Sequence, residues 1–122
     1  MNVRLSNKDA GYVYIDNKKT RIKDVKQRTA DFIELTQGRG AIVLHTDQRA
    51  RHNTVVTVRT GLSDAYDKVR NDYSKKNFRR SYNLLSIHQR NEVNRMFPVR
   101  ITIVDAESAN HRVDRPYRAY SP

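Results

Sequence analysis

Cysteine is absent from this 122-residue chain, and no long apolar run interrupts its polar sequence. The missing thiols exclude a disulfide framework, a cysteine nucleophile and thiolate metal sites, and they suit the cytoplasm and the periplasm equally. No window approaches the roughly 20 continuous apolar residues of a membrane-spanning helix. No apolar signal-peptide segment follows Met1. We therefore expect either a cytoplasmic protein or the soluble part of a longer one.

Motifs of the common enzyme classes are missing as well. The loop at residues 46–53 has no phosphate-binding glycines, and no serine lies in a G-x-S-x-G or S-x-x-K pattern. The histidines are widely separated and lack the i, i+4 spacing of a zinc site. His45, Asp47 and His52 could meet across one loop, but a polar loop at the end of a strand explains them more simply. We expect no enzyme, no cofactor and no metal site.

Basic residues outnumber acidic ones, 24 to 13, which gives a net charge of +11. Residues 68–100 contain nine Lys/Arg and two acids and carry +7 of that charge. A basic surface favours nucleic acid, anionic lipid headgroups or an acidic protein, and charge alone does not choose among them. The 37% hydrophobic content is typical of a soluble globular protein, and the length suits one domain.

Alternating residues predict short strands in the first twenty or so positions, with a tight turn at Asp16-Asn17 that makes a hairpin. A helical face with period i, i+4, i+7 and i+8 follows from about Lys23 and ends before Gly38. Its members are Val25, Thr29, Phe32 and Ile33. Residues 41–45 (AIVLH) then form a short apolar run that predicts a buried strand. A strand, a polar loop and an amphipathic helix in succession make an α/β building unit.

The second predicted helix runs from Thr54 to about Ser74, with Asn53 or Thr54 as its N-cap. Its apolar positions recur at spacings of three and four: Val55, Val58, Leu62, Ala65, Tyr66 and Val69. Gly61 inside this helix costs about 1 kcal/mol relative to alanine. We attribute that glycine to close packing of the helix on the sheet.

A capping-box pair, Ser86 and Gln89, starts a third helix that Pro98 ends. Its expected buried side consists of Leu85, Val93, Met96 and Phe97. A half-buried strand follows at residues 100–104. We expect one domain at residues 1–105 and a mobile C-terminal tail at residues 106–122.

The last strand is a candidate partner-binding or dimer edge because no strong element follows it. The residues concerned are Val99, Arg100, Ile101, Thr102, Ile103 and Val104. Two placements stay open at this point. The strand lies either at the edge of the sheet, where its backbone is available to a partner, or between two other strands.

The basic stretch at residues 73–82 also has two interpretations. Its cations are Lys75, Lys76, Arg79 and Arg80, and they alternate with Tyr73, Phe78 and Tyr82. Cations mixed with stacking rings are the components of a single-strand nucleic-acid surface. Alternatively, the rings anchor a junction between helices while the cations stay solvated, and we favour this second interpretation.

Several segments in fixed order carry a family resemblance: 14–20 (YIDNKKT), 41–47 (AIVLHTD), 65–70 (AYDKVR), 84–86 (LLS) and 97–101 (FPVRI). Together with the two helical patterns between them, they resemble the periplasmic domain of the ExbD/TolR family of biopolymer transport proteins over residues 13–103. The last three segments resemble an ExbD branch with an extra helical segment before the last strand. Each motif is loose, and their shared order and spacing support the resemblance.

The resemblance implies an α+β fold, with a small mixed β-sheet of about four to five strands, two main helices on one face and an extra short helix. It also implies one N-terminal transmembrane helix, absent from this chain, so that Met1 is not the natural start. In the family, the aspartate that carries protons lies in that helix. The chain would then be the soluble part of an inner-membrane, single-span protein, located in the periplasm.

In the family, ExbD forms a dimer inside an ExbB channel and couples the proton motive force to TonB, which energises outer-membrane transport. TolR acts in parallel with TolA. The resemblance therefore implies a homodimer, an ExbB-like channel subunit and a TonB-like partner, with no nucleic acid. The excess positive charge departs from the family and suits an acidic partner segment or anionic lipid headgroups. The alternative from another class is a small basic nucleic-acid-binding protein of the cytoplasm; a structural assembly protein is a third possibility.

Overall fold

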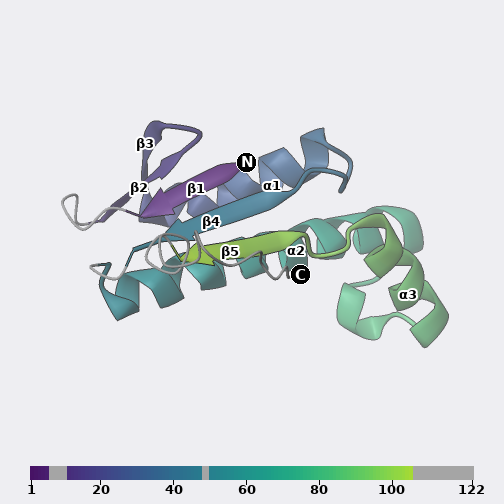
Figure 1. The fold of residues 1–122 in the computed structure, drawn as a ribbon. Helices are drawn as coiled ribbons and strands as arrows, with labels where there is room; N and C mark the ends of the chain where they lie inside the picture. The colour runs from purple at the N-terminus through teal and green to yellow at the C-terminus, as the bar shows by residue number, and fades with distance from the viewer. Residues whose placement is uncertain (6–10, 48–49, 106–122) are drawn as a thin grey trace.

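Five strands of the described residues form one mixed sheet in the order β3-β2-β1-β4-β5 (Figure 1). The computed structural model describes residues 1–5, 11–47 and 50–105. The strands are β1 (Asn2–Leu5), β2 (Tyr12–Ile15), β3 (Lys18–Arg21), β4 (Ile42–Thr46) and β5 (Ile101–Asp105). The helices are α1 (Val25–Leu35), α2 (His52–Phe78) and α3 (Ile87–Met96), with 3-10 turns η1 (Ile22–Asp24) and η2 (Tyr82–Leu84). The predicted α+β class is confirmed.

The sheet combines an antiparallel half with a parallel half. β1 pairs antiparallel with β2 and parallel with β4, and β4 pairs parallel with β5. The β2–β3 hairpin turns through Asp16 and Asn17, whose φ angles of 49° and 70° are those of a two-residue turn with both central residues left-handed. Asx residues tolerate this region better than most, so the sequence signal for the turn was specific.

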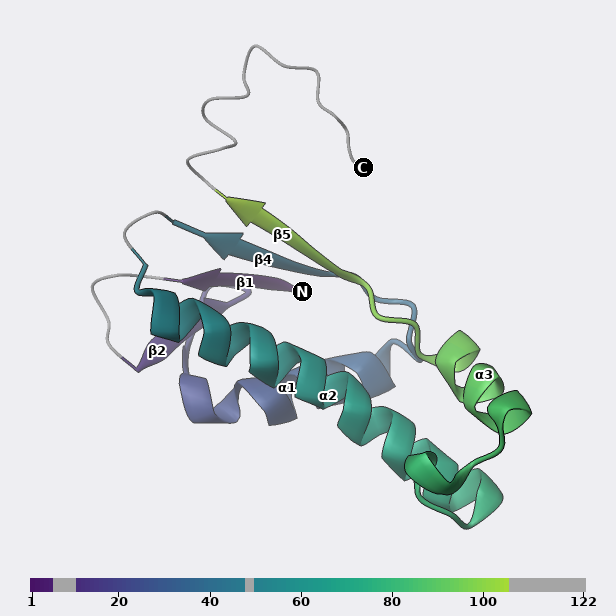
Figure 2. The same ribbon diagram turned by 90° about the horizontal axis from the view of Figure 1, so that it is seen from below.

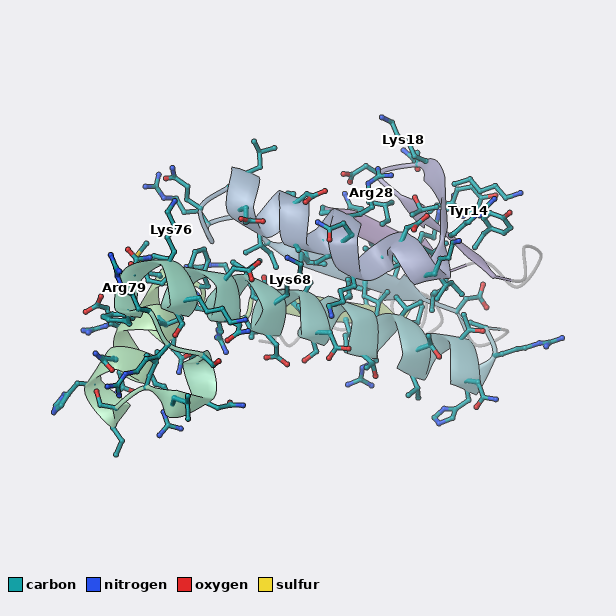
Figure 3. The ribbon with its side chains drawn as sticks, turned by 180° about the vertical axis from the view of Figure 1, so that it is seen from behind. Tyr14, Lys18, Arg28, Lys68, Lys76 and Arg79 are labelled. Carbon is teal, nitrogen blue, oxygen red and sulfur yellow. The ribbon has the colours of Figure 1, made fainter. Side chains whose placement is uncertain are left out.

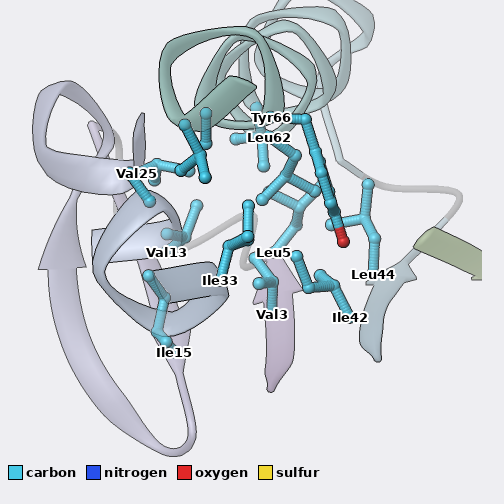
Figure 4. Packing of buried hydrophobic residues seen from close by; sticks show 14 of the residues in the cluster. Val3, Leu5, Val13, Ile15, Val25, Ile33, Ile42, Leu44, Leu62 and Tyr66 are labelled. Atoms are coloured by element: carbon cyan, nitrogen blue, oxygen red, sulfur yellow. The ribbon is translucent and has the colours of Figure 1, made fainter. Parts of the chain in front are cut away.

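α1 and α2 lie side by side on one face of the sheet (Figures 2 and 3). Alternate strand residues point toward them and are buried, including Val3, Val13 and Leu44. The helices contribute Ile33 and Tyr66 to the same core, and Figure 4 shows these side chains meeting between the layers. The opposite face of the sheet has no helix over it in the described part of the chain.

The long helix α2 is longer than predicted at both ends, since it runs from His52 to Phe78 rather than from Thr54 to about Ser74. The role of its glycine also differs from the prediction. The helix starts at His52 with Arg51 as an extended N-cap that offers no side-chain hydrogen bond, so the expected caps at Asn53 or Thr54 are wrong. A Cβ on Gly61 would lie 3.5 Å from the Val25 Cγ1 atom of α1. Gly61 therefore faces α1 and not the sheet, and the contact there is ordinary rather than close.

The capping box at the start of α3 is confirmed: Ser86 accepts from the Gln89 N–H, and the Gln89 side chain accepts from the Ser86 N–H. Leu85, Val93 and Phe97 are buried as expected, but Met96 is 43% exposed. Val93 and Phe97 are one turn apart and occupy the buried side, so Met96, about 100° around the helix from Phe97, faces outward. The tail expected at residues 106–122 lies outside the described residues.

Candidate partner-binding surfaces

β5 lies at one end of the strand order and, among the described strands, pairs with β4 alone. Of the two placements that the sequence left open, the structure has the edge position within the described part of the chain. The regular strand begins at Ile101, so Val99 and Arg100 belong to the connection from α3.

The backbone of β5 presents alternate residues to β4 and to the free edge. The Arg100 carbonyl accepts from the Ile42 N–H at 2.8 Å, and the Val104 carbonyl accepts from the Thr46 hydroxyl at 3.4 Å. In a parallel strand both main-chain groups of a residue point toward the same neighbour and alternate residues point oppositely. The N–H and C=O groups of Thr102 therefore face β4, and those of Ile101 and Ile103 face the open edge.

The two edges of the sheet differ in chemistry. β3 carries the cations Lys18, Lys19 and Arg21, a common protection of edge strands against unwanted pairing. β5 has the sequence ITIVD, with neither lysine nor proline, and its Ile103 is 45% exposed. Of the two edges of the sheet in the described part of the chain, the β5 edge is therefore the one that lacks this protection against pairing with another strand.

Four hydrogen bonds fix the approach to this edge, two donated by α2 and two donated by Arg100 in the connection to β5. The Arg70 guanidinium donates to the Phe97 carbonyl from Nε at 3.0 Å and from Nη2 at 2.8 Å. The Arg100 N–H donates to the Tyr66 hydroxyl at 3.2 Å, and Arg100 Nε donates to the Gly38 carbonyl at 3.1 Å. The edge strand is thus held in place at its start.

The predicted basic surface lies at the C-terminal end of α2. Lys75, Lys76, Arg79 and Arg80 are all exposed, and Figure 3 shows Lys76 and Arg79 there, well separated from Lys18 and Arg28. Arg79 is the C-cap of α2, with a left-handed φ of 60°.

Two of the three aromatic residues of this stretch make contacts inside the junction, and the third, Phe78, is half-buried. The Tyr73 ring meets Phe97 edge-on, with centroids 5.5 Å apart and planes at 73°. The Tyr82 hydroxyl donates to Asn94 Oδ1 at 2.7 Å. These contacts agree with the interpretation in which the rings anchor a helix junction and the cations remain in water.

A further surface, which the sequence analysis missed, is the sheet face opposite the helices. The guanidinium of Arg4 lies 4.6 Å from the centre of the Tyr14 ring, and Lys19 Nζ lies 4.6 Å from that of Tyr12. An open cavity of about 500 Å³ lies beside the first pair, lined in part by Asn2 and His45. The alternation of tyrosines with lysine and arginine in the first strands is the sequence pattern that could have predicted this surface.

His45 and Lys68 are titratable residues whose side chains make polar contacts in the described part of the chain. His45 Nε2 lies 3.2 Å from Asn2 Oδ1, and the described ranges hold no group of three His, Cys, Asp or Glu side chains placed to bind a metal ion. A hydrogen bond to Asp72 raises the pKa of Lys68, and both partners of this i, i+4 pair are solvent-exposed in part. Such a pair contributes little to stability.

None of the helices in the described segments is both long and apolar enough to cross a bilayer. Comparisons with protein-family models, curated proteins and solved structures found no match to this chain.

Proposed function

We propose that this chain is the periplasmic domain of an ExbD-like subunit of a TonB–ExbB–ExbD complex, which uses the proton motive force to drive outer-membrane transport. In this proposal it performs no catalysis. It forms a homodimer and binds an extended segment of a TonB-like protein, and the free edge of β5 is the surface for both. The observation that supports the proposal most directly is the edge position of β5, whose outer side is not paired with any other strand of the described residues.

The family resemblance supports the proposal through the places its segments occupy. Residues 14–20 form most of the β2–β3 hairpin, residues 41–47 contain β4, and residues 97–101 lead into β5. Two helices on one face of a small sheet is the arrangement that the resemblance implies. The extra helical segment expected before the last strand corresponds in position to α3.

The edge geometry suits two modes of pairing. Two copies of β5 can pair antiparallel about a two-fold axis, which is the usual symmetry of soluble dimers. An extended partner segment can instead add to the sheet as a sixth strand, with main-chain hydrogen bonds supplying affinity. Both modes use the outward N–H groups of Ile101 and Ile103, so they compete for one edge.

A proline at position 103 tests the role of this edge. Ile103→Pro removes an N–H that faces away from β4, so the fold should tolerate it as an edge strand tolerates proline. Ile103→Ala is the matched control, because it removes most of the same side chain and keeps the N–H. We expect sedimentation equilibrium to show self-association that Ile103→Pro weakens and Ile103→Ala largely preserves. Equal self-association in both variants contradicts pairing through β5.

The membrane context has its own test. The native reading frame ahead of residue 1 should encode an apolar span of about 20 residues that contains one aspartate. The full-length product should then co-purify with an ExbB-like channel subunit from membranes. A frame that encodes no such span contradicts the ExbD-like assignment.

Nucleic-acid binding is the alternative function, and the exposed Lys75, Lys76, Arg79 and Arg80 are the observation in its favour. Fluorescence titration with single-stranded DNA and RNA at two salt concentrations separates the two proposals. Micromolar binding that weakens steeply with salt favours the alternative, because phosphate contacts release counterions. Absence of binding removes it.

A further inference from the structure

A protruding lobe combines exposed cations with exposed aliphatic side chains. The lobe consists of residues 74–97, which are the end of α2, η2 and α3, and it projects beyond the sheet (Figure 2). Leu84 is 67% exposed and Ile87 is 70% exposed, although Leu85 between them is 3% exposed and packs inward. Two apolar side chains, one at the end of η2 and one at the start of α3, are thus exposed to water.

The lobe has a large excess of positive charge. It contains six Lys/Arg and a single acid, Glu92. The salt bridge of the described residues, Lys68–Asp72, lies outside the lobe, and in the described part of the chain no lobe cation pairs with a carboxylate. The field of these cations is therefore available to an anionic partner.

We propose that this lobe is a peripheral docking site for anionic phospholipid, in which Leu84 and Ile87 enter the headgroup region and the cations contact lipid phosphates. Aliphatic side chains beside lysine and arginine are typical of interfacial membrane binding. A single-strand nucleic-acid surface instead needs free aromatic faces. Tyr73 packs edge-on against Phe97, and the Tyr82 hydroxyl donates to Asn94 Oδ1. Both residues and Phe78 are half-buried, so none of these three rings is fully exposed.

The topology places the lobe at a definite end of the sheet. β1, β4 and β5 are parallel and start at the same end, and residues 97–100 lead from α3 directly into β5. The first residue therefore lies at the end of the sheet nearest the lobe (Figures 1 and 2). If the proposed function holds, an anchoring helix ahead of residue 1 would bring the lobe toward the headgroups. The chemistry of the lobe itself does not depend on that function.

Binding of the 122-residue chain to vesicles tests the proposal. Vesicles of equimolar phosphatidylglycerol and phosphatidylcholine are compared with pure phosphatidylcholine in a flotation assay. One variant removes two lobe cations, Lys76→Gln with Arg79→Gln. Its matched control removes two exposed cations elsewhere, Lys18→Gln with Arg28→Gln, at the same net charge. A third variant, Leu84→Gln with Ile87→Gln, removes the apolar pair, and Val56→Gln, at a valine that is 45% exposed, is its control.

We expect binding to the phosphatidylglycerol vesicles and much less to phosphatidylcholine alone. Loss of the two lobe cations should lower the partition coefficient on the order of tenfold or more, since each basic residue at an anionic surface contributes several-fold. Loss of the apolar pair should lower it roughly tenfold. The two controls should stay within about threefold, because charges beyond a Debye length from the surface are screened. Circular dichroism checks that each variant is folded.

Three results overturn the proposal. The first is that the protein does not bind anionic vesicles. The second is that the lobe variants and their controls lose vesicle binding equally. The third is that the lobe variants bind vesicles as well as the unmodified protein does but lose binding to a single-stranded oligonucleotide. The third result assigns the lobe to nucleic acid. Failure here is distinct from failure of the proposed function, because self-association through β5 is measured without lipid and with Ile103→Pro, which leaves the lobe intact.

Discussion

Arg70 of α2 binds the main-chain carbonyl of Phe97, at the end of α3, through both Nε and Nη2, at 3.0 and 2.8 Å. This forked contact joins the long helix to the point where the chain leaves the lobe and turns toward β5. Phe97 is only 8% exposed, and its ring also contacts the Tyr73 ring. The position of the edge strand therefore depends on two kinds of contact that Phe97 makes with α2: hydrogen bonds to its carbonyl and an aromatic contact of its ring.

Replacing Arg70 with methionine should lower the free energy of unfolding by about 1–3 kcal/mol, because the partly buried carbonyl loses both donors. Urea unfolding measures the change. Arg59→Met is the matched control, since Arg59 is an exposed residue of the same helix and its replacement should change stability by less than about 0.5 kcal/mol. Equal effects in the two variants contradict a specific role for the Arg70–Phe97 contact.

A second link to β5 predicts a smaller effect. The Tyr66 hydroxyl accepts from the Arg100 N–H, and Tyr66 is 1% exposed in the core. Tyr66→Phe keeps the ring and leaves that N–H without its partner, so we expect a loss of about 1–2 kcal/mol. Amide hydrogen exchange should quicken at Arg100. Tyr12→Phe, on the face opposite the helices, is the control, and comparable loss in both variants contradicts the prediction.

Local signals in the sequence predicted most of the elements, because each depends on few residues. Asp16-Asn17 fixed the hairpin through their tolerance of positive φ, and Ser86 with Gln89 fixed the start of α3 through a reciprocal hydrogen bond. The helical faces followed from the spacing of apolar residues. The prediction that Met96 is buried was wrong, because the spacing of apolar residues alone does not show which of several neighbouring residues lie on the buried side of a helix.

The sheet order and the surfaces depend on contacts between distant segments, which no local pattern encodes. β1 lies between β2 and β4, and the β1–β4 register pairs Val3 with Leu44 across some forty residues of sequence. The same limit applies to the candidate sites. The sequence predicted which residues form the β5 edge and the basic stretch. That the main-chain groups of Ile103 face the open edge, and that Leu84 and Ile87 are exposed, depends on tertiary packing.

Gly61 offers a stabilising substitution. A methyl group there would be in ordinary van der Waals contact with Val25, at 3.5 Å from Cγ1. Gly61→Ala should therefore raise the free energy of unfolding by up to about 1 kcal/mol, the difference in helix propensity between the two residues. Thermal unfolding measures the gain. Gly61→Val is the comparison variant, and it should not gain stability, because a branched side chain is too large for the space beside α1. A less stable alanine variant would show that α1 and α2 pack more closely than the distance indicates.

Gly38 and Gly11 form a matched pair that separates backbone strain from steric contact. Both have positive φ, 77° and 80°, so alanine costs about 1–2 kcal/mol at either position. A Cβ on Gly11 meets none of the described residues within 4 Å, whereas one on Gly38 would collide with the Met96 carbonyl oxygen.

Gly38→Ala should therefore destabilise the protein by roughly 1–3 kcal/mol more than Gly11→Ala in urea unfolding, the usual range for overpacking. Because the Gly38 carbonyl also accepts from Arg100 Nε, displacement of this loop should loosen the start of β5 as well. Hydrogen exchange of residues 100–104 should then quicken in Gly38→Ala and stay unchanged in Gly11→Ala. Equal losses of stability in the two variants would mean that the loop after α1 does not press against the end of α3.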